Sequence, residues 1–411
     1  MKHTSFISFL VLSTICHASG NTPPRVFMLN PDHLEFVQTE AEDPNSVFAD
    51  DLKALYARAE EILAKGTVYS VTATDDLPPS GDIHDYFSTS PYWWPDPSKP
   101  DGLPYIRRDG ETNPERDRIS DRKPLESMIR DVGVLSRAYY FSKEEKYAGW
   151  AARLLHTWFL DPKTRMNPNL SHGQLVRGRN LGKAGALIGT RRFCLLIDSV
   201  GLLDGAEAWT GIDQAGLQAW MSEFFDWMMV HPFGAEERSA SNNHGTAFDM
   251  QAVSIALFLE KLYAAELLLR YYTFERIRTQ IEPNGAQPEE LRRTKAWNYS
   301  VENIKYLFRL ARMARHVGIN LYAFHPEKKG DLKSAIDFLL PYTTVENNWP
   351  YRQITEWQPT RFALTLQVAR AVYEDPALDA VAERMGWEQP NLEEFINMPD
   401  PTRLSQSEQQ N

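Results

Sequence analysis

The sequence has very little cysteine. Of 411 residues only Cys16 and Cys194 carry a thiol. Cys16 directly follows the apolar run Phe6–Ile15, and a run of this length after a charged start and before small residues is typical of a cleaved secretory signal peptide. Lipidation at Cys16 is less favoured, because an isoleucine stands where a small residue is expected. We therefore expect residues 1–20 to be removed and the protein to be periplasmic or secreted, with one thiol left and a fold that depends on its core.

The sequence also lacks a second long apolar run and an excess of basic residues. No segment after residue 20 is apolar for long enough to cross a bilayer, so membrane insertion is not expected. The net charge of −11 argues against nucleic acid as a partner, because nucleic-acid binders carry broad basic faces. An anionic substrate remains compatible with this charge, since a local group of cations is enough to bind one. Such a group is formed by Arg177, Arg179, Lys183, Arg191, Arg192, Arg292, Arg293 and Lys295.

Strand-like alternation and fixed-period repeats are absent as well, and helical periodicity takes their place. Apolar residues recur at spacings of three and four from Asp51 onward. The segments with this pattern are 51–63, 128–139, 146–159, 183–200, 214–229, 245–272, 301–317, 332–340, 360–373 and 378–385. We therefore predict an all-α fold in which one domain, residues 21–400, forms an (α/α) toroid of about six to seven helical hairpins around a cleft. A polar tail covers residues 401–411.

One long stretch, Asp75–Lys123, has no helical pattern and is rich in aromatic residues. A loop of this length in a compact domain is either functional or disordered, and its aromatic residues argue against disorder. We expect it to cover the cleft, with Tyr92, Trp93 and Trp94 stacking on sugar rings. The alternative is that these rings anchor the loop to the body of the protein.

Two short segments carry the chemistry. Asn242–Thr246 reads Asn-Asn-His-Gly-Thr, and Arg292–Ser300 supplies arginines and Tyr299, without a metal-ligand cluster beside them. An amide, an imidazole, a guanidinium and a phenol suit the removal of a carbon-bound proton beside a carboxylate. Donors to that carboxylate stabilise the enolate-like intermediate by roughly 3 kcal/mol each. An imidazole or phenol then moves the proton, and a nearby arginine is expected to lower the pKa of the tyrosine.

Four segments resemble the alginate lyase family of polysaccharide lyases. They are Ser90–Asp96, Gly178–Gly182, Asn242–Gln251 and Gln280–Tyr299. The resemblance spans about residues 85–360 and implies an (α/α) toroid that cleaves a uronate polysaccharide by β-elimination, without a cofactor. Alginate is the expected substrate, with polymannuronate preferred. The Trp-Trp-Pro loop fits a related branch better, so a glucuronan lyase of the same fold is the alternative.

The resemblance also implies roles for individual residues. Asn243 and His244 neutralise the uronate carboxylate, and His244 acts as base when the proton lies on the other face of the sugar. Tyr299 is the acid and, for mannuronate-like geometry, also the base, supported by Arg293. The expected substrate-binding residues are Tyr92, Trp93, Trp94, Gln174, Arg179, Asn242 and Arg292.

The choice of arginine stays open. The family places its arginine seven residues before the tyrosine, whereas Arg293 precedes Tyr299 by six. On one continuous helix Arg292 shares a face with Tyr299, because seven residues make nearly two turns.

Two functions of other classes remain. A glycoside hydrolase on the same fold needs two working carboxylates, for which Asp249 with Glu289 or Glu290 can be proposed. Glu289 and Glu290 are better explained as first-turn residues of a helix that starts at Pro288. A non-catalytic binder of anionic glycans would leave the chain length of its ligand unchanged. Endo or exo action and the oligomeric state stay open.

Overall fold

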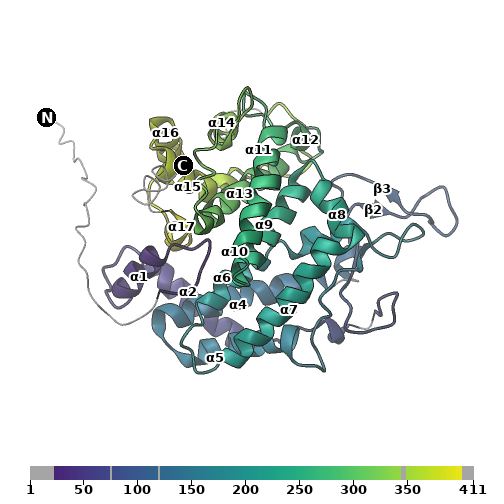
Figure 1. The fold of residues 1–411 in the computed structure, drawn as a ribbon, viewed down its shortest axis with the longest axis horizontal. Helices are drawn as coiled ribbons and strands as arrows, with labels where there is room; N and C mark the ends of the chain where they lie inside the picture. Colours follow the sequence, from purple (N-terminus) through teal and green to yellow (C-terminus); the bar gives the residue numbers. More distant parts are fainter. Residues whose placement is uncertain (1–22, 75, 119–120, 344–348, 400–411) are drawn as a thin grey trace.

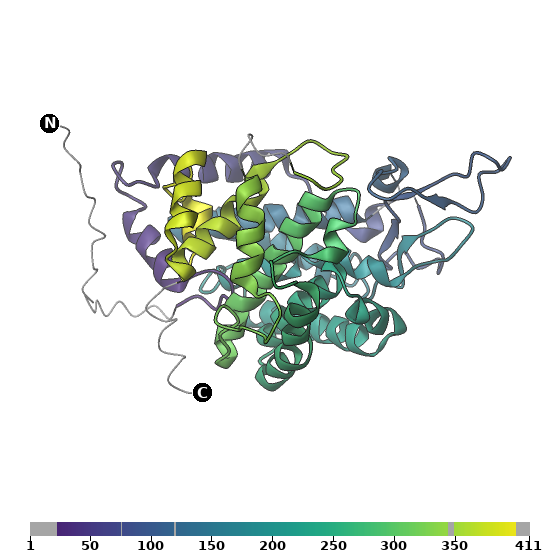
Figure 2. The same cartoon turned by 90° about the horizontal axis from the view of Figure 1, so that it is seen from above.

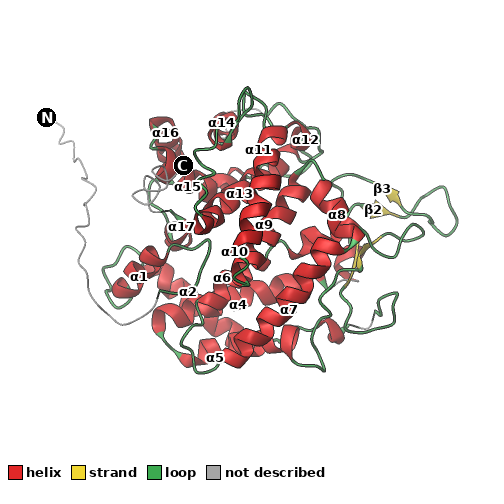
Figure 3. Cartoon of the chain, in the orientation of Figure 1, coloured by secondary structure: helices red, strands yellow, loops and turns green. Residues whose placement is uncertain are grey.

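The computed structural model describes residues 23–74, 76–118, 121–343 and 349–399. The predicted signal peptide and polar tail lie outside these residues. Helices dominate the described part of the chain (Figures 1 and 3). The α-helices are α1 (Pro31–Glu40), α2 (Ala49–Lys65), α3 (Glu115–Arg118), α4 (Arg122–Ser142), α5 (Glu145–Leu155), α6 (Phe193–Gly201), α7 (Gly211–Val230), α8 (Pro232–Ser239), α9 (Asn243–Phe258), α10 (Leu262–Leu268), α11 (Phe274–Gln280), α12 (Pro288–Leu291), α13 (Ala296–Ala314), α14 (Leu332–Leu339), α15 (Ala363–Tyr373), α16 (Pro376–Met385) and α17 (Leu392–Asn397).

Consecutive helices pack as hairpins, and the predicted all-α toroid is confirmed. Contacting pairs include α4 with α5, α7 with α8, α9 with α10 and α13 with α14. Helix α9 lies among α6, α7, α8, α10 and α13 (Figure 1). Every residue of α9 except His244 is buried, as expected for a helix that is covered on all sides. The fold therefore presents the start of α9, with its Asn-Asn-His motif, from the rigid centre of the molecule.

Several predicted boundaries were wrong. The segment 183–200 is a 3₁₀ helix, Ala184–Thr190, followed by α6, and 245–272 is divided because Glu260 takes a left-handed φ of 60° between α9 and α10. Residues 232–239, absent from the predicted helical segments, form α8, which starts with Pro232 behind the cap residue His231. Gly234 permits this helix, because a Cβ there would lie 1.7 Å from the carbonyl oxygen of Met228.

The long aromatic segment is folded. Strand β1 (Phe87–Thr89) pairs in parallel with β4 (His172–Leu175), and β2 (Trp93–Trp94) pairs with β3 (Ile106–Arg107) as an antiparallel hairpin. In Figures 1 and 2 this hairpin extends from one side of the helical body. The β1–β4 ladder joins the aromatic segment to the strand that carries Gln174, so two stretches expected to bind substrate are neighbours.

Both ends of the described chain pack together on the opposite side of the molecule. Helix α1 contacts α17 (Figure 1). The buried Asp198 carboxylate accepts hydrogen bonds from the backbone N–H groups of Phe27, Met28 and Leu29 at 2.8–2.9 Å. Cys194 is a buried free thiol, as expected. None of the described helices has the length and apolar character needed to cross a membrane.

Candidate active site

The start of α9 holds two of the predicted catalytic residues. Asn242 caps the helix, and its side-chain oxygen accepts a hydrogen bond from the His244 N–H at 3.1 Å. Gly245 follows because the backbone is crowded there: a Cβ would lie 2.2 Å from the Ala240 carbonyl oxygen. Arg276 fastens this turn by donating to the carbonyl oxygens of Arg238 and Ala240 at 2.6 and 2.9 Å. Asn243 and His244 are therefore held on a fixed backbone.

Asn243 is held by a buried carboxylate. Glu290 of α12 accepts the Asn243 backbone N–H at 2.6 Å and its side-chain Nδ2–H at 2.7 Å. The two residues are 2% and 1% exposed. Burial raises the pKa of Glu290 to about 7, against the opposing effect of the hydrogen bonds from Asn243. Because an amide nitrogen carries two hydrogens, this clamp leaves the second one for another acceptor, such as a substrate carboxylate.

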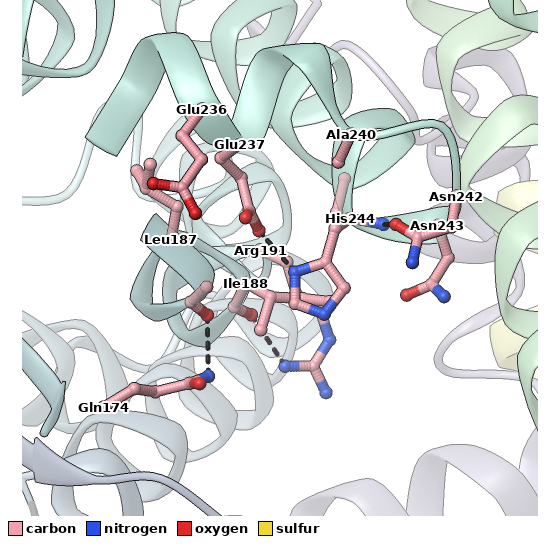
Figure 4. A network of polar contacts seen from close by, with 12 residues as sticks. Gln174, Leu187, Ile188, Arg191, Glu236, Glu237, Ala240, Asn242, Asn243 and His244 are labelled. Atoms are coloured by element: carbon pink, nitrogen blue, oxygen red, sulfur yellow. Dashed lines mark hydrogen bonds and ion pairs between the residues drawn. The ribbon is translucent and has the colours of Figure 1, made fainter. Parts of the chain in front are cut away.

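His244 is held by a second buried carboxylate. Its Nδ1 lies 2.5 Å from Oε1 of Glu237, which comes from α8 and is 4% exposed (Figure 4). On its other side lies Gly185, where a Cβ would be 3.6 Å from His244 Cε1 and 3.3 Å from Gln174 Oε1. Gln174, whose Nε2 donates to the Gly185 carbonyl oxygen at 2.6 Å, therefore faces the same space as His244.

Tyr299 is enclosed by Tyr92 and Arg293. The Tyr299 hydroxyl lies 2.9 Å from that of Tyr92, and the Arg293 guanidinium lies 4.0 Å from the centroid of the Tyr299 ring. Burial raises the pKa of Tyr299 well above its ordinary value, and Tyr92 adds to the effect. Arg293 opposes this shift without outweighing it. The expectation that the arginine lowers the tyrosine pKa is therefore wrong in net effect, because desolvation of the phenolate is the larger contribution.

The structure assigns the neighbouring arginine to position 293. The continuous helix that favoured Arg292 does not exist, since α12 ends at Leu291 and α13 begins at Ala296. In the break Arg293 turns toward Tyr299 and donates to both carboxylate oxygens of Asp109, at 2.9 and 3.1 Å. Arg292 instead forms an ion pair with Glu289, and its side chain is 67% exposed. Of the two arginines left open by the sequence, Arg293 is the one that contacts Tyr299.

Asp109 joins the aromatic segment to this break. The hydroxyl of Thr294 donates to its backbone carbonyl oxygen at 2.9 Å. Burial alone would raise the pKa of Asp109, but the hydrogen bonds and charge of Arg293, with Thr294, lower it to about 2. The ionised Asp109 therefore fixes the guanidinium that stacks on Tyr299.

A buried amide network connects the two chemical motifs. Gln280 accepts from the Thr246 hydroxyl at 3.0 Å and from Asn303 Nδ2 at 2.9 Å, and Asn303 Nδ2 also lies 2.8 Å from Gln287 Oε1. These residues belong to α9, α11, α13 and the start of α12. The charges are coupled as well, because both Arg293 and His244 act on Glu290 electrostatically. The structure thus brings Asn243, His244, Arg293 and Tyr299 into one connected group.

The comparisons with known proteins agree with this group. The family model described as alginate lyase matches residues 70–349. The chain belongs to the alginate lyase family. It is therefore a polysaccharide lyase. A comparison with curated proteins found no match.

Solved structures support the same assignment. A crystal structure of an alginate lyase from Bacteroides ovatus is 36% identical, with a TM-score of 0.87, and the alignment covers 92% of this chain and all of that chain. Alginate lyase A1-III from Sphingomonas species A1, in a tyrosine-to-phenylalanine variant complexed with a tetrasaccharide, is 14% identical with a TM-score of 0.51 over 86% of this chain and 93% of that one. At that identity the second likeness concerns the fold alone.

The tryptophans of this lyase are partly covered. The Arg179 guanidinium lies 5.0 Å from the Trp93 ring centroid and donates to the Tyr105 carbonyl oxygen at 2.7 Å. Trp94 lies beneath Arg108 at 5.2 Å and donates to the Glu111 carbonyl oxygen at 3.0 Å. These contacts support the anchoring role that was the alternative to sugar stacking. The Arg179 side chain therefore stacks on Trp93. The contacts of Trp94 are instead with Arg108 and Glu111 of the aromatic segment.

The carboxylates that a hydrolase would need are committed elsewhere. Asp249 is fully buried and receives two hydrogen bonds from Arg276, at 2.6 and 2.9 Å. Glu289 pairs with Arg292, and Glu290 holds Asn243. Within the described residues no three His, Cys, Asp or Glu side chains are grouped as metal ligands.

Three carboxylates of the lyase escaped the sequence analysis. Glu290 was interpreted as a first-turn helix residue, which is correct but incomplete, since its carboxylate points inward. Glu237 lies on α8, a helix absent from the predicted segments, although Pro232 at a first helical position was a usable indication of it. Asp109 gave no local indication, because its partners Arg293 and Thr294 lie about 185 residues away.

Proposed function

We propose that this lyase cleaves alginate by β-elimination, with polymannuronate as the preferred substrate and Tyr299 as the residue that moves the proton. The observation that carries the proposal is the pairing of a donor site with a proton-transfer site. Asn243, clamped by Glu290, has an N–H left for a carboxylate. Tyr299 lies between Arg293 and the hydroxyl of Tyr92.

In this proposal the uronate carboxylate binds at Asn243 and His244. Hydrogen bonds there stabilise the negative charge that develops when the proton on C5 is removed. The electrons of the C5–H bond form the C4–C5 double bond, and the bond from C4 to the glycosidic oxygen breaks. The leaving oxygen takes a proton, which completes the balance of the reaction.

Tyr299 fits the proton-donating role directly. Its raised pKa keeps the hydroxyl protonated before substrate binds, as an acid requires. To act as base on mannuronate it must first become a phenolate. The Arg293 guanidinium over its ring and the Tyr92 hydroxyl at 2.9 Å are the groups that stabilise that phenolate. Gln174 and Arg179 are proposed to bind neighbouring parts of the anionic oligosaccharide.

The test is a substrate panel. We expect polymannuronate to give product that absorbs in the ultraviolet, faster than polyguluronate and faster than glucuronan. A faster reaction on glucuronan would move the assignment to a glucuronan lyase of this fold. Chain cleavage without ultraviolet absorbance would indicate hydrolysis, and binding without cleavage would indicate a glycan-binding protein.

We also propose that the protein is exported with residues 1–20 removed. The support is the apolar run Phe6–Ile15 between a charged start and small residues. The mass of the protein recovered from the periplasm or medium tests this. Retention of Met1 in an exported form contradicts it.

A further inference from the structure

Four cations that the proposed reaction does not use lie on two of the helices that pack against α9. These helices are α6 and α13. The cations stand at the start of α6 and along α13, and we call them the cation group: Arg191, Arg192, Lys305 and Arg309. Lys305 and Arg309 follow Tyr299 on α13 by six and ten residues, so at 1.5 Å per residue they lie about 9 and 15 Å further along the helix axis.

The charges of the cation group act on one another and are poorly balanced. Burial lowers the pKa of Lys305 to about 8, and the three arginines of the group contribute to this shift. One carboxylate lies among them. Glu302 accepts a hydrogen bond from the Tyr306 hydroxyl at 2.7 Å, and its Oε1 lies 3.7 Å from Arg191 Nε. Within the part of the chain that the structure describes, the side chains of the other three cations form neither a hydrogen bond nor an ion pair.

Such a group of like charges is costly in a folded protein. Arg192, Lys305 and Arg309 are half-buried, so water screens their mutual repulsion less than it would at an exposed surface. The protein as a whole is acidic, with a net charge of −11, and the group is therefore no consequence of a basic composition. An anion bound among the three side chains would remove the repulsion and give their N–H groups acceptors.

A small cavity adjoins the group on the side away from the candidate active site. Arg192 lines this cavity of about 190 Å³ together with Met28 near the N-terminus and Asn397 of α17. Arg130 and Arg137 also line it, but both form ion pairs with acidic residues. The cavity is smaller than the roughly 300–1,000 Å³ of a site for a drug-sized ligand, so it has room for a small anion and not for a sugar chain.

We propose that Arg192, Lys305 and Arg309 bind a small inorganic oxyanion, such as phosphate or sulfate, at a site separate from the one proposed for the uronate carboxylate. The two guanidinium groups suit a pair of oxyanion oxygens, and the lysine adds a point charge. The anion links α6 to α13, which both pack against the helix that carries Asn243 and His244. It takes no part in the reaction and stabilises the helices around it.

The experiment titrates phosphate into the wild type, Lys305→Gln and the matched control Lys53→Gln by calorimetry. Lys53 is an exposed lysine of α2, and its replacement removes the same charge far along the chain from the group. We expect the wild type to bind one phosphate, and Lys305→Gln to bind it at least about tenfold more weakly, the loss expected for one hydrogen bond between charged groups. Lys53→Gln should bind within about twofold of the wild type.

Melting temperatures of the same proteins separate a binding role from a merely structural one. Without phosphate, Lys305→Gln should melt higher than the wild type, because one repelling charge is gone. With saturating phosphate the order should reverse, because only the wild type is stabilised by a tightly bound ligand. A rise of equal size in all three proteins would be the general effect of phosphate on folded proteins and would overturn the inference. If Lys305→Gln fails to fold, Arg309→Gln takes its place, with the same expected results.

The other outcomes are equally decisive. Absence of binding to the wild type at millimolar phosphate overturns the inference, and so does equal affinity in the wild type and Lys305→Gln. Displacement of phosphate by an oligomannuronate would place a substrate carboxylate among these cations and overturn the assignment to a free anion. The titrations need no turnover. The failure of this inference and the failure of the proposed function are therefore distinguishable.

Discussion

The two halves of the active site are built in different ways. The half that is proposed to bind the carboxylate, Asn243 and His244, stands on a helix that is buried on all sides and is held by the buried carboxylates of Glu290 and Glu237. The half that is proposed to transfer the proton, Tyr299 and Arg293, stands beside a break between helices. It is completed by Tyr92 and Asp109 from a segment about 185–207 residues away. One half is fixed by the core, and the other depends on a distant segment docking correctly.

This difference has a chemical reason. A donor site for a developing charge works best when its geometry is fixed before the substrate binds. A phenol that donates and accepts a proton needs its pKa adjusted, and the groups that adjust it can come from any part of the chain that reaches it. Perturbing each half should therefore give different failures.

The largest effect is expected at Tyr299, the residue proposed to transfer the proton. Tyr299→Phe keeps the ring beneath Arg293 and removes the hydroxyl to which that role is assigned. We expect turnover on polymannuronate to fall by about 10³- to 10⁴-fold, the upper range for acid–base groups. Stopped absorbance assays measure the rate, and the melting temperature serves as the control for folding. Turnover within tenfold of wild type would remove Tyr299 from the mechanism.

The donor half should show the next largest effect. Asn243→Ala removes the N–H proposed to bind the substrate carboxylate, and we expect kcat to fall by about 10²- to 10³-fold. The change also leaves Glu290 buried without its side-chain donor, so stability must be measured in the same preparation. Asn242→Ala removes the cap of the same helix at a cost of about 1 kcal/mol in stability, so it shows how much of the kcat loss comes from disturbing the start of α9. Similar kcat losses in both variants would make Asn243 a structural residue.

The dependence on a distant segment is tested at Asp109. Asp109→Asn weakens the two hydrogen bonds that hold Arg293, and we expect kcat/KM to fall about tenfold because bonds to charged groups contribute about 1.5–3 kcal/mol. Arg292→Gln is the control. It removes a guanidinium one residue away whose side chain is 67% exposed, and should change kcat/KM by less than about twofold. If Arg292→Gln lowered kcat/KM more than Asp109→Asn does, Arg292 rather than Arg293 would be the arginine that supports Tyr299.

The two halves should also differ in how pH affects stability. The folded-state pKa of Glu290 is raised to about 7, so its contribution to stability is present below pH 4.5 and is lost as the pH rises through 7. The pKa of Asp109 is lowered to about 2, so its contribution is present above pH 3.8 and is lost as the pH falls through 2. We expect Glu290→Gln to gain stability relative to wild type between pH 5 and 8, by up to about 3 kcal/mol. Denaturant unfolding at several pH values measures this, and a pH-independent difference would contradict the raised pKa.

Much of the scaffold could be predicted from the sequence, because it follows from local patterns. Helices α4, α5 and α7 have apolar residues at helical spacing, and their ends lie within six residues of the predicted ones. The start of α9 was recognisable from Asn242 as a cap. The position of Asn243 and His244 at a helix start could be predicted because both residues lie on one local turn.

The remainder depends on contacts that no local pattern reveals. Arg292 to Lys295 would continue a helix well, and the break exists because Thr294 and Arg293 bind Asp109 from the aromatic segment. The raised pKa of Tyr299 reflects burial, which spacing in the sequence cannot give. Glu237 and Glu290 are ordinary acidic residues of short helices until the fold turns them inward.

The central claim is that this lyase breaks the chain by elimination. The most direct test digests an oligomannuronate of defined length and weighs the products. We predict two fragments whose masses sum to that of the starting oligosaccharide, with ultraviolet absorbance from the new double bond in one of them. Fragments that together are heavier by one water, without that absorbance, would show hydrolysis and contradict the account.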